Sequence, residues 1–539
     1  MLKLRIKNTS NMNDFATTYT PFTDQYTVEF DGAVTTARGY YTIELTERET
    51  FNIFRPWNTS ISPEKYGLYW THDIYDELPG KFSLETPNWN YHYVGESWNN
   101  YPGISQFVRE GVDWGHDAKY GKTLATDYTN PEFHDYFAEL VAMLNSDVDG
   151  ILLDWWHDRH FEINSESEVA KAREQIAQHV REKMGDNFLL VGNVNWDKDT
   201  ATIDNLNGVF LELWKPNFNA YTSIEIDTMV DILNYYEKEL LYPKLIAFEP
   251  WRVTQQSKPR TEDRLTPENQ RFAKLFATIL NVHTSNGYYL YTDSNFEDTY
   301  EGVFEGTISD GGHAWYSFYD LDIGKPTSKG VEVANRIGVR KYEKGLLGYN
   351  YTSKDIDIVT PNGTIKIPSQ SGEILYLVGG EYQPINFIGE VTNKIYSGNS
   401  SDYKFYKLGS SKYGVGTTSG IDELTGVSIL KFDDKDMSLE SDIKGTFDQV
   451  TGLNTDSGEM FRLYNAAFAR FPDADGLKYW IDQFSSGRNT RRVVAQSFLD
   501  SVEFTEKYGS NVSDETYVNN LYKNVLGRDA DAAGLNYWV

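Results

Sequence analysis

The 539-residue chain contains no cysteine. Disulfide bridges, thiol redox chemistry and cysteine-ligated metals are therefore excluded. No window approaches the eighteen or so apolar residues of a membrane-spanning helix, so no membrane insertion is expected. The start, MLKLRIKNTSNMNDF, has no apolar run of the length that a signal peptide needs. Three explanations stay open: the protein is exported by a C-terminal or other route, it is assembled into a virion, or the chain is a fragment.

Positive charge is also scarce. There are 50 Lys and Arg residues against 79 Asp and Glu residues, which gives a formal net charge of −29. Nucleic acid and anionic membranes would be repelled, so neither is expected as a partner. The expected location is extracellular or at the cell surface, or alternatively in a virion such as a phage tail, and an acidic protein without cysteine fits secretion systems or virus particles that bypass oxidative folding.

Aromatic residues, in contrast, are abundant. They make up 15% of the chain, with 13 Trp and 38 Tyr. Large flat side chains fill protein cores, and the same side chains stack on sugar rings. Composition alone leaves both interpretations open.

The chain divides by pattern into five segments. We expect an N-terminal β segment over 1–50, a barrel over 51–328, a β-sandwich accessory domain over 329–392, a β-rich module over 393–452 and a helical repeat domain over 453–539. The repeat is internal: RLYNAAFARFPDADGLKYWI (462–481) aligns without gaps on NLYKNVLGRDADAAGLNYWV (520–539). Units of this kind stack on one another, and the second unit looks incomplete. The repeats therefore predict self-association or a larger surface or virion assembly.

The barrel prediction rests on alternation of strands and helices. The stretch PEFHDYFAELVAMLNS has apolar residues at helical spacing, and DVDGILLDWW follows as a continuous apolar run bounded by Asp149 and Gly150. The strands FLLVGNVNW, GVFLELW, PKLIAFEPW and GYYLYTD follow, mostly with helices between them, and FNIFRPW and YGLYWTH are candidate early strands. This order predicts an α/β fold with a (β/α)8 TIM-type barrel. An open doubly wound sheet is the alternative, but the Gly-rich phosphate loop that it needs is missing.

Polar residues stand at the end of each expected strand, where such barrels place their active sites. Asp154 ends one strand, and Glu212 and Glu249 lie near the ends of two others. A carboxylate in an apolar run is costly unless it is paired, so buried salt bridges or helix caps are the structural alternative. Candidate substrate-binding residues are His72, Asp73, Trp155, His157, Asn193, Asn195, Trp196, Trp214, Trp251, Arg252, Tyr291 and Asp293.

Two carboxyl groups, amides and aromatic platforms are what glycoside hydrolysis requires. The group His157, Asp158 and His160 suggests a metal site, but with all three on one loop, substrate contacts or a surface loop are the preferred interpretation. The Asp-rich stretches DADG and DADAAG lack the terminal Glu of a calcium loop. No metal and no cofactor are expected.

The segment TDYTNPEFHDYFAELV followed by DVDGILLDWW resembles the fourth-strand region of glycoside hydrolase barrels. The resemblance implies that Asp154 is a catalytic carboxylate, and a galactosaminidase-like group with a Glu on its sixth strand implies Glu212 as its partner. A clan with its nucleophile on strand seven makes Glu249 the third candidate. FYDLDIGKP and VRKYEKGLLGYN also resemble these enzymes, where the chain passes into a β-sandwich, so the resemblance covers about 120–390. The stretch ETPNWNYHYVGESWNNYPG departs from the usual third-strand pattern.

The helical repeat resembles a domain of unknown function, DUF4214, found in repetitive surface and secreted proteins, many of them cyanobacterial. The sequence thus predicts a glycoside hydrolase that acts on an extracellular or cell-surface polysaccharide and is tethered by its C-terminal modules, with retention favoured over inversion. The alternative is a non-catalytic protein that binds glycan or builds a surface layer or phage tail.

Overall fold

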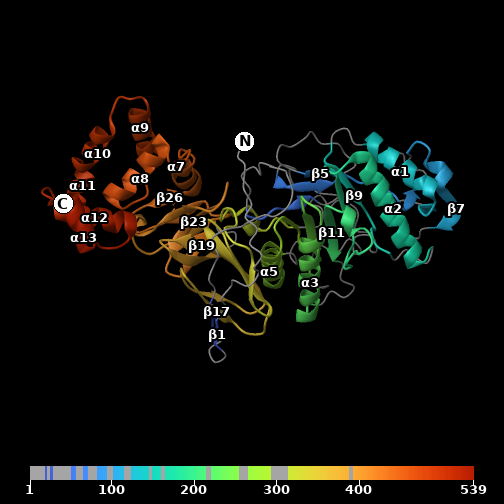
Figure 1. The fold of residues 1–539 in the computed structure, drawn as a ribbon. Coiled ribbons are helices and arrows are strands. Elements are labelled where there is room, and N and C mark those ends of the chain that lie inside the picture. The colour runs from blue at the N-terminus through green and yellow to red at the C-terminus, as the bar shows by residue number, and fades with distance from the viewer. Residues whose placement is uncertain are drawn as a thin grey trace. The chain divides into compact units, whose positions relative to one another are not determined.

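The computed structural model describes residues 18–20, 25–27, 50–55, 65–70, 82–93, 101–113, 123–144, 148–158, 164–213, 220–253, 265–292, 314–387 and 392–539. The chain forms two compact units (Figure 1). The first comprises Met1–Tyr319 and Gly324–Ile374, and the second comprises Asp320–Ile323 and Leu375–Val539. The division falls inside strand β19 (Ser371–Val378), so the boundaries expected near residues 328 and 392 stay predictions.

Eight parallel strands form the centre of the first unit, in the order in which they occur along the chain. They are β3 (Phe54–Arg55), β4 (Leu68–Trp70), β5 (Phe82–Glu85), β9 (Gly150–Leu153), β10 (Leu189–Asn193), β11 (Gly208–Leu213), β12 (Leu245–Pro250) and β13 (Gly287–Tyr289). A parallel bridge between Ile53 and Tyr289 joins the last strand to the first. The predicted TIM-type barrel is confirmed, and its early strands lie in FNIFRPW and YGLYWTH.

In the described part of the chain, four helices connect the later strands: α1 (Pro131–Leu144), α2 (Glu166–Met184), α3 (Ser223–Glu239) and α5 (Pro267–His283). Local sequence fixes where α2 and α3 begin, because Ser165 and Thr222 each form a capping box with the glutamate three residues later. Between β10 and β11 the chain makes only a 3-10 turn, η4 (Ile203–Asn205). The barrel therefore departs from a strict strand-helix alternation at this step.

The aromatic stretch after β5 is an insertion into the barrel. It forms an antiparallel sheet in the order β6-β8-β7, from β6 (Tyr91–Tyr93), β7 (Val108–Asp113) and β8 (Thr123–Thr126), with η3 (Ile104–Phe107) before β7. The insertion explains why the third-strand region does not follow the usual pattern.

Two further groups of strands belong to the described part of the first unit. Strands β14 (Val331–Ala334), β15 (Ile337–Lys341) and β16 (Gly345–Asn350) are antiparallel, and the hairpin of β17 (Ile356–Thr360) and β18 (Gly363–Ile367) pairs with β2 (Gln25–Thr27), which pairs with β1 (Thr18–Thr20). The buried Arg340 donates to the carbonyls of Asn281 (2.5 Å) and Thr284 (2.6 Å) at the end of α5. One arginine thereby caps a barrel helix and attaches β15 to it.

The second unit begins with two groups of strands. In one, β20 (Glu381–Phe387), β24 (Gly420–Glu423), β23 (Tyr413–Thr417) and β22 (Phe405–Lys407) pair in that order, and in the other, β21 (Asn393–Ile395), β25 (Ile429–Lys431) and β26 (Asp436–Ser438) form a three-stranded sheet. The helices α7 (Gly445–Phe447), α8 (Asp456–Phe468), α9 (Ala474–Ser485), α10 (Arg491–Leu499), α11 (Val502–Tyr508), α12 (Asp514–Leu521) and α13 (Ala532–Trp538) follow. Among the described residues, no helix combines the length and apolar character needed to cross a membrane.

Four of the residues shared by the two repeat units form the same contacts in each. Asp473 caps α9 by accepting from the backbone N–H of Gly476, and Arg470 lies over the ring of Tyr464, 5.2 Å from its centre. A side chain at Gly476 would collide with the Tyr464 hydroxyl, so glycine is required there. In the second unit Tyr522, Arg528, Asp531 and Gly534 repeat the arrangement. The Asp-rich stretches therefore serve as helix caps.

Candidate active site at the strand ends

The inner face of the barrel is apolar within the strands and acidic toward their C-terminal ends. Phe54 stacks on Trp70 with ring centroids 5.0 Å apart, and Trp70 lies 4.9 Å from Phe210. Side chains alternate along a strand, so Glu212, two residues after Phe210, faces the same side. On β12, Phe248 packs outward against Phe276 of α5, so its neighbour Glu249 faces inward with Glu212.

Three carboxyl groups thus meet on one side of the barrel, at strands four, six and seven. Asp154 directly follows β9, and Glu212 and Glu249 are direct partners in the register of β11 with β12. Glu249 is 6% exposed, whereas Asp154 and Glu212 are only partly buried. No group of three or more His, Cys, Asp or Glu suited to a metal ion occurs among the described residues.

Asn193, at the end of β10, links two of these carboxyl groups. Its Nδ2 donates to Asp154 Oδ1 (2.8 Å) and to Glu212 Oε2 (3.0 Å). Its Oδ1 accepts from the backbone N–H of Asn195 (3.3 Å), which fixes the amide with its nitrogen toward the acids. The sequence predicted Asn193 as a sugar-binding amide, but the structure uses both of its N–H bonds to hold the acids in place.

The environment raises the pKa values of both glutamates. Burial and the nearby charge of Asp154 raise the pKa of Glu212 to about 7, and the Asn193 amide opposes this in part. Burial, followed by the charge of Glu212, raises the pKa of Glu249 well above its ordinary value. Asp154 accepts from the backbone N–H of Trp155 (3.0 Å) as well as from Asn193, and both bonds favour its ionised form.

A stability measurement tests the raised pKa of Glu212 without any substrate. Folded Glu212 takes up a proton near pH 7, whereas in the unfolded chain it does so near 4.5. The folded state therefore binds more protons in this window, and its stability falls as the pH rises through it. Glu212→Gln removes this loss, so it should raise the free energy of unfolding at pH 8 by up to about 3 kcal/mol and have little effect at pH 4.

Urea unfolding of both proteins at pH 4, 6 and 8 would measure the difference. A difference that is the same at all three values would contradict the raised pKa.

The loop after β9 is held on several sides. Trp89, from the segment after β5, donates its ring N–H to the carbonyl of Asp154 (2.7 Å). Trp155 has a backbone φ of 54°, a left-handed conformation that is costly for a bulky residue. Trp156 is fully buried and donates its backbone N–H to the carbonyl of Asn193 (2.7 Å). The loop that carries Asp154 is thereby anchored to the segment after β5 and to the end of β10.

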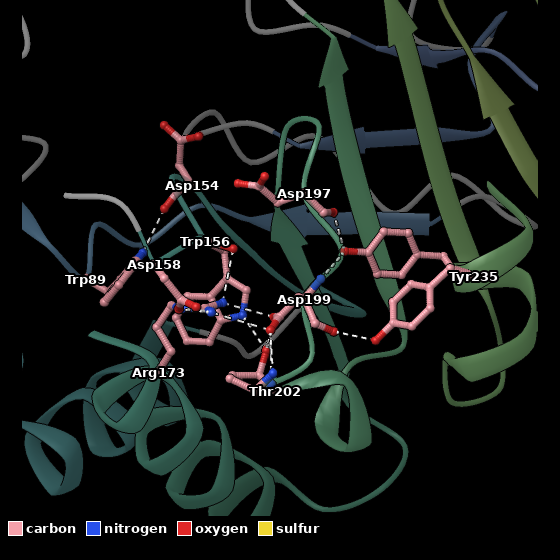
Figure 2. A network of polar contacts seen from close by, with 11 residues as sticks. Trp89, Asp154, Trp156, Asp158, Arg173, Asp197, Asp199, Thr202 and Tyr235 are labelled. Atoms are coloured by element: carbon pink, nitrogen blue, oxygen red, sulfur yellow. Dashed lines mark hydrogen bonds and ion pairs between the residues drawn. The ribbon is translucent and has the colours of Figure 1, made fainter. Parts of the chain in front are cut away.

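Beneath this loop lies a buried ion-pair network (Figure 2). Arg173 of α2 is 1% exposed and donates to Asp199 Oδ2 (2.9 Å), to the carbonyl of Trp156 (3.1 Å) and to Asp158 Oδ1 (3.1 Å from Nε). Asp199 also accepts from the Thr202 hydroxyl. Sequence reasoning missed Arg173, although a charged residue at a position spaced with Val169 and Ile176 on the apolar face of a helix was a signal.

The other residues predicted to bind substrate differ in how far they are exposed. Trp155, Asn195 and Trp196 are partly exposed beside the carboxylates' strand ends, and the ring of His157 lies 5.3 Å from that of Trp155. Trp251 and Arg252 are buried at 3% exposure each. His72, Asp73, His160, Trp214 and Asp293 lie outside the described residues.

Tyr291 requires a correction. Its hydroxyl donates to Asn269 Oδ1 of α5 (2.8 Å) and accepts from the backbone N–H of Val253 (3.2 Å). It faces the helix because it continues the outward alternation of Tyr289, whose hydroxyl also reaches α5, at Ala273. Tyr291 is therefore a packing residue and not part of the acidic site.

Comparison with known proteins gives a family match at the C-terminus and structural neighbours of low similarity. Residues 447–505 and 495–539 match the domain of unknown function DUF4214, which confirms the resemblance of the helical repeat. No curated protein matches the chain by sequence.

The structural neighbours include glycoside hydrolases with barrel folds. Ega3 of Aspergillus fumigatus, in complex with galactosamine, is 10% identical, with 47% of this chain and 96% of Ega3 covered and a TM-score of 0.33. The glycoside hydrolase domain of PelA from Pseudomonas aeruginosa is 11% identical (40% and 88% covered, TM-score 0.29). An α-amylase from Malbranchea cinnamomea is 10% identical (62% and 98% covered, TM-score 0.37). At these scores the reaction has to be argued from the site itself.

Proposed function

We propose that the barrel is a retaining glycoside hydrolase in which Asp154 is the nucleophile and Glu212 the acid and base. The observation that carries the proposal is the shared amide of Asn193. Because Asp154 Oδ1 and Glu212 Oε2 lie 2.8 Å and 3.0 Å from one nitrogen, they are at most the sum of these distances apart, about 5.8 Å. Carboxyl groups about 5–5.5 Å apart suit retention, whereas inversion needs about 6.5–9.5 Å to admit a water molecule.

The two acids differ in the way that the reaction requires. Glu212, with its raised pKa, carries a proton at mildly acidic pH and can transfer it to the leaving glycosidic oxygen. Asp154 accepts hydrogen bonds from two N–H donors, Trp155 and Asn193. It attacks the anomeric carbon as a carboxylate, and the bond from that carbon to the leaving oxygen breaks.

The second half of the reaction follows from the same electrostatics. Once Asp154 is bonded to the sugar it has lost its charge, so its contribution to the raised pKa of Glu212 disappears. Glu212 then accepts a proton from water, whose oxygen attacks the anomeric carbon and releases Asp154. The charge of Asp154 thus switches Glu212 between acid and base.

The surroundings favour a sugar without negative charge. Three carboxyl groups meet at the site, and a polyanionic glycan such as a uronate polymer would be repelled. Trp155 and Trp196 are partly exposed close to the strand ends and offer flat surfaces for sugar rings. A neutral or amino-sugar polysaccharide is therefore the proposed substrate class.

The test is a hydrolysis screen against neutral, amino-sugar and uronate polysaccharides at pH 5–6, where Glu212 is protonated. We expect cleavage of a neutral or amino-sugar polymer. NMR spectra taken during the first turnovers should show the product released with the anomeric configuration of the substrate. Release of the opposite anomer would contradict the retaining geometry, and absence of cleavage across the panel would favour a glycan-binding barrel.

A further inference from the structure

Glu249 is the third carboxyl group of the site and has no part in the reaction above. It is the register partner of Glu212 on the neighbouring parallel strand, and adjacent strands lie about 4.8 Å apart. Its side chain faces inward and is 6% exposed. Neither glutamate forms an ion pair with a Lys, Arg or His side chain of the described residues.

Ionising both Glu212 and Glu249 at these neighbouring positions would cost much free energy. Each charge loses hydration on burial, and each repels the other at short range. Glu212 is the group better able to become charged, because it accepts from Asn193 and is more exposed. The proton that relieves the repulsion therefore belongs on Glu249, and the raised pKa of Glu249, caused first by burial, agrees with this.

We propose that Glu249 is a neutral carboxylic acid whose O–H donates a hydrogen bond to an oxygen of the bound glycan. This inference rests on the proposed function for its kinetic part only. It makes Glu249 a substrate-binding donor and distinguishes it from a strand-seven nucleophile, which would have to be ionised.

Infrared difference spectroscopy tests the protonation state without a substrate. At pH 7, the spectrum of the wild type minus that of Glu249→Gln should contain the C=O band of a protonated carboxylic acid. Glu373→Gln is the matched control, because Glu373 is also largely buried but is paired with Lys274 (3.3 Å) and should contribute a carboxylate band only. A carboxylate band in place of the acid band for Glu249 would overturn the proposal.

Kinetics on a cleaved polysaccharide test the donor role. Glu249→Gln keeps a neutral donor of similar shape, so kcat/KM should fall by less than about tenfold and keep the pH profile of the wild type. Glu249→Leu removes the donor and should lower kcat/KM by about 10²-fold or more. A Gln variant as inactive as Asp154→Asn would identify a charged catalytic role, and a Leu variant with wild-type kinetics would show that Glu249 does not contact the glycan.

The two proposals can fail separately. If the wild type cleaves nothing, the proposed hydrolase function fails, and the infrared difference still decides whether Glu249 is neutral. If the wild type cleaves and the acid band is missing, the inference about Glu249 fails and the hydrolase stands.

Discussion

Asp154→Asn should lower kcat on a cleaved polysaccharide by about 10³–10⁵-fold, because an amide cannot act as the attacking carboxylate. The fold should be preserved. The asparagine oxygen can still accept from the backbone N–H of Trp155 and from Asn193, as Asp154 does. The measurement is kcat for the purified variant, with circular dichroism as a check on folding.

The matched control lies at the other end of the same strand. Asp149 precedes β9 and accepts from the backbone N–H (2.8 Å) and hydroxyl (3.3 Å) of Ser83, away from the strand ends that carry the acids. Asp149→Asn should therefore leave kcat within a few-fold of the wild type. If both variants were equally active, Asp154 would not be the nucleophile.

A substrate with an activated leaving group separates the roles of the two acids. A dinitrophenolate departs without protonation, so Glu212→Gln should still form the covalent sugar adduct on Asp154 and then release it slowly. Asp154→Asn should form no adduct. Mass spectrometry of the intact protein would show which variant gains the mass of the sugar.

Arg173→Leu should destabilise the barrel by about 3–5 kcal/mol, the cost typical of breaking a buried ion pair from one side. The change leaves Asp199, which is 5% exposed, without its cationic partner. It also removes the donor to the carbonyl of Trp156, two residues after Asp154. Urea unfolding followed by tryptophan fluorescence measures the loss.

Lys183→Ala is the control for Arg173, because both lie on α2. Lys183 pairs with Glu139 across the surface, with the two side chains 40% and 64% exposed, and such a pair contributes under about 1 kcal/mol. Losses of similar size in the two variants would mean that the buried network adds no more to stability than a surface pair.

Sequence pattern predicted the barrel because its signals are local. The helix at α1 and the strand at β9 each follow from spacing within about fifteen residues, and Asp154 at the strand end follows from the same segment. The pattern could not predict that one amide would join Asp154 to Glu212, because this depends on β10 lying between β9 and β11.

The sequence pattern also could not predict whether a side chain faces the inside or the outside of the barrel. Tyr291 lies beyond the end of β13, and whether it faces the site or α5 depends on strand register, which hydrophobicity does not reveal there. The role of Arg173 also depends on long-range contacts, since Asp199 and Asp158 lie 26 and 15 residues away in sequence. The buried network could only be recognised once these segments were placed together.

The contacts shared by the two repeat units have a consequence for how such chains grow. Tyr464, Arg470, Asp473 and Gly476 lie within one helix pair, so the bend between α8 and α9 is encoded inside the unit itself. A duplicated stretch of gene would carry these four residues with it, so each new copy would bring the bend between its two helices without a new turn having to evolve.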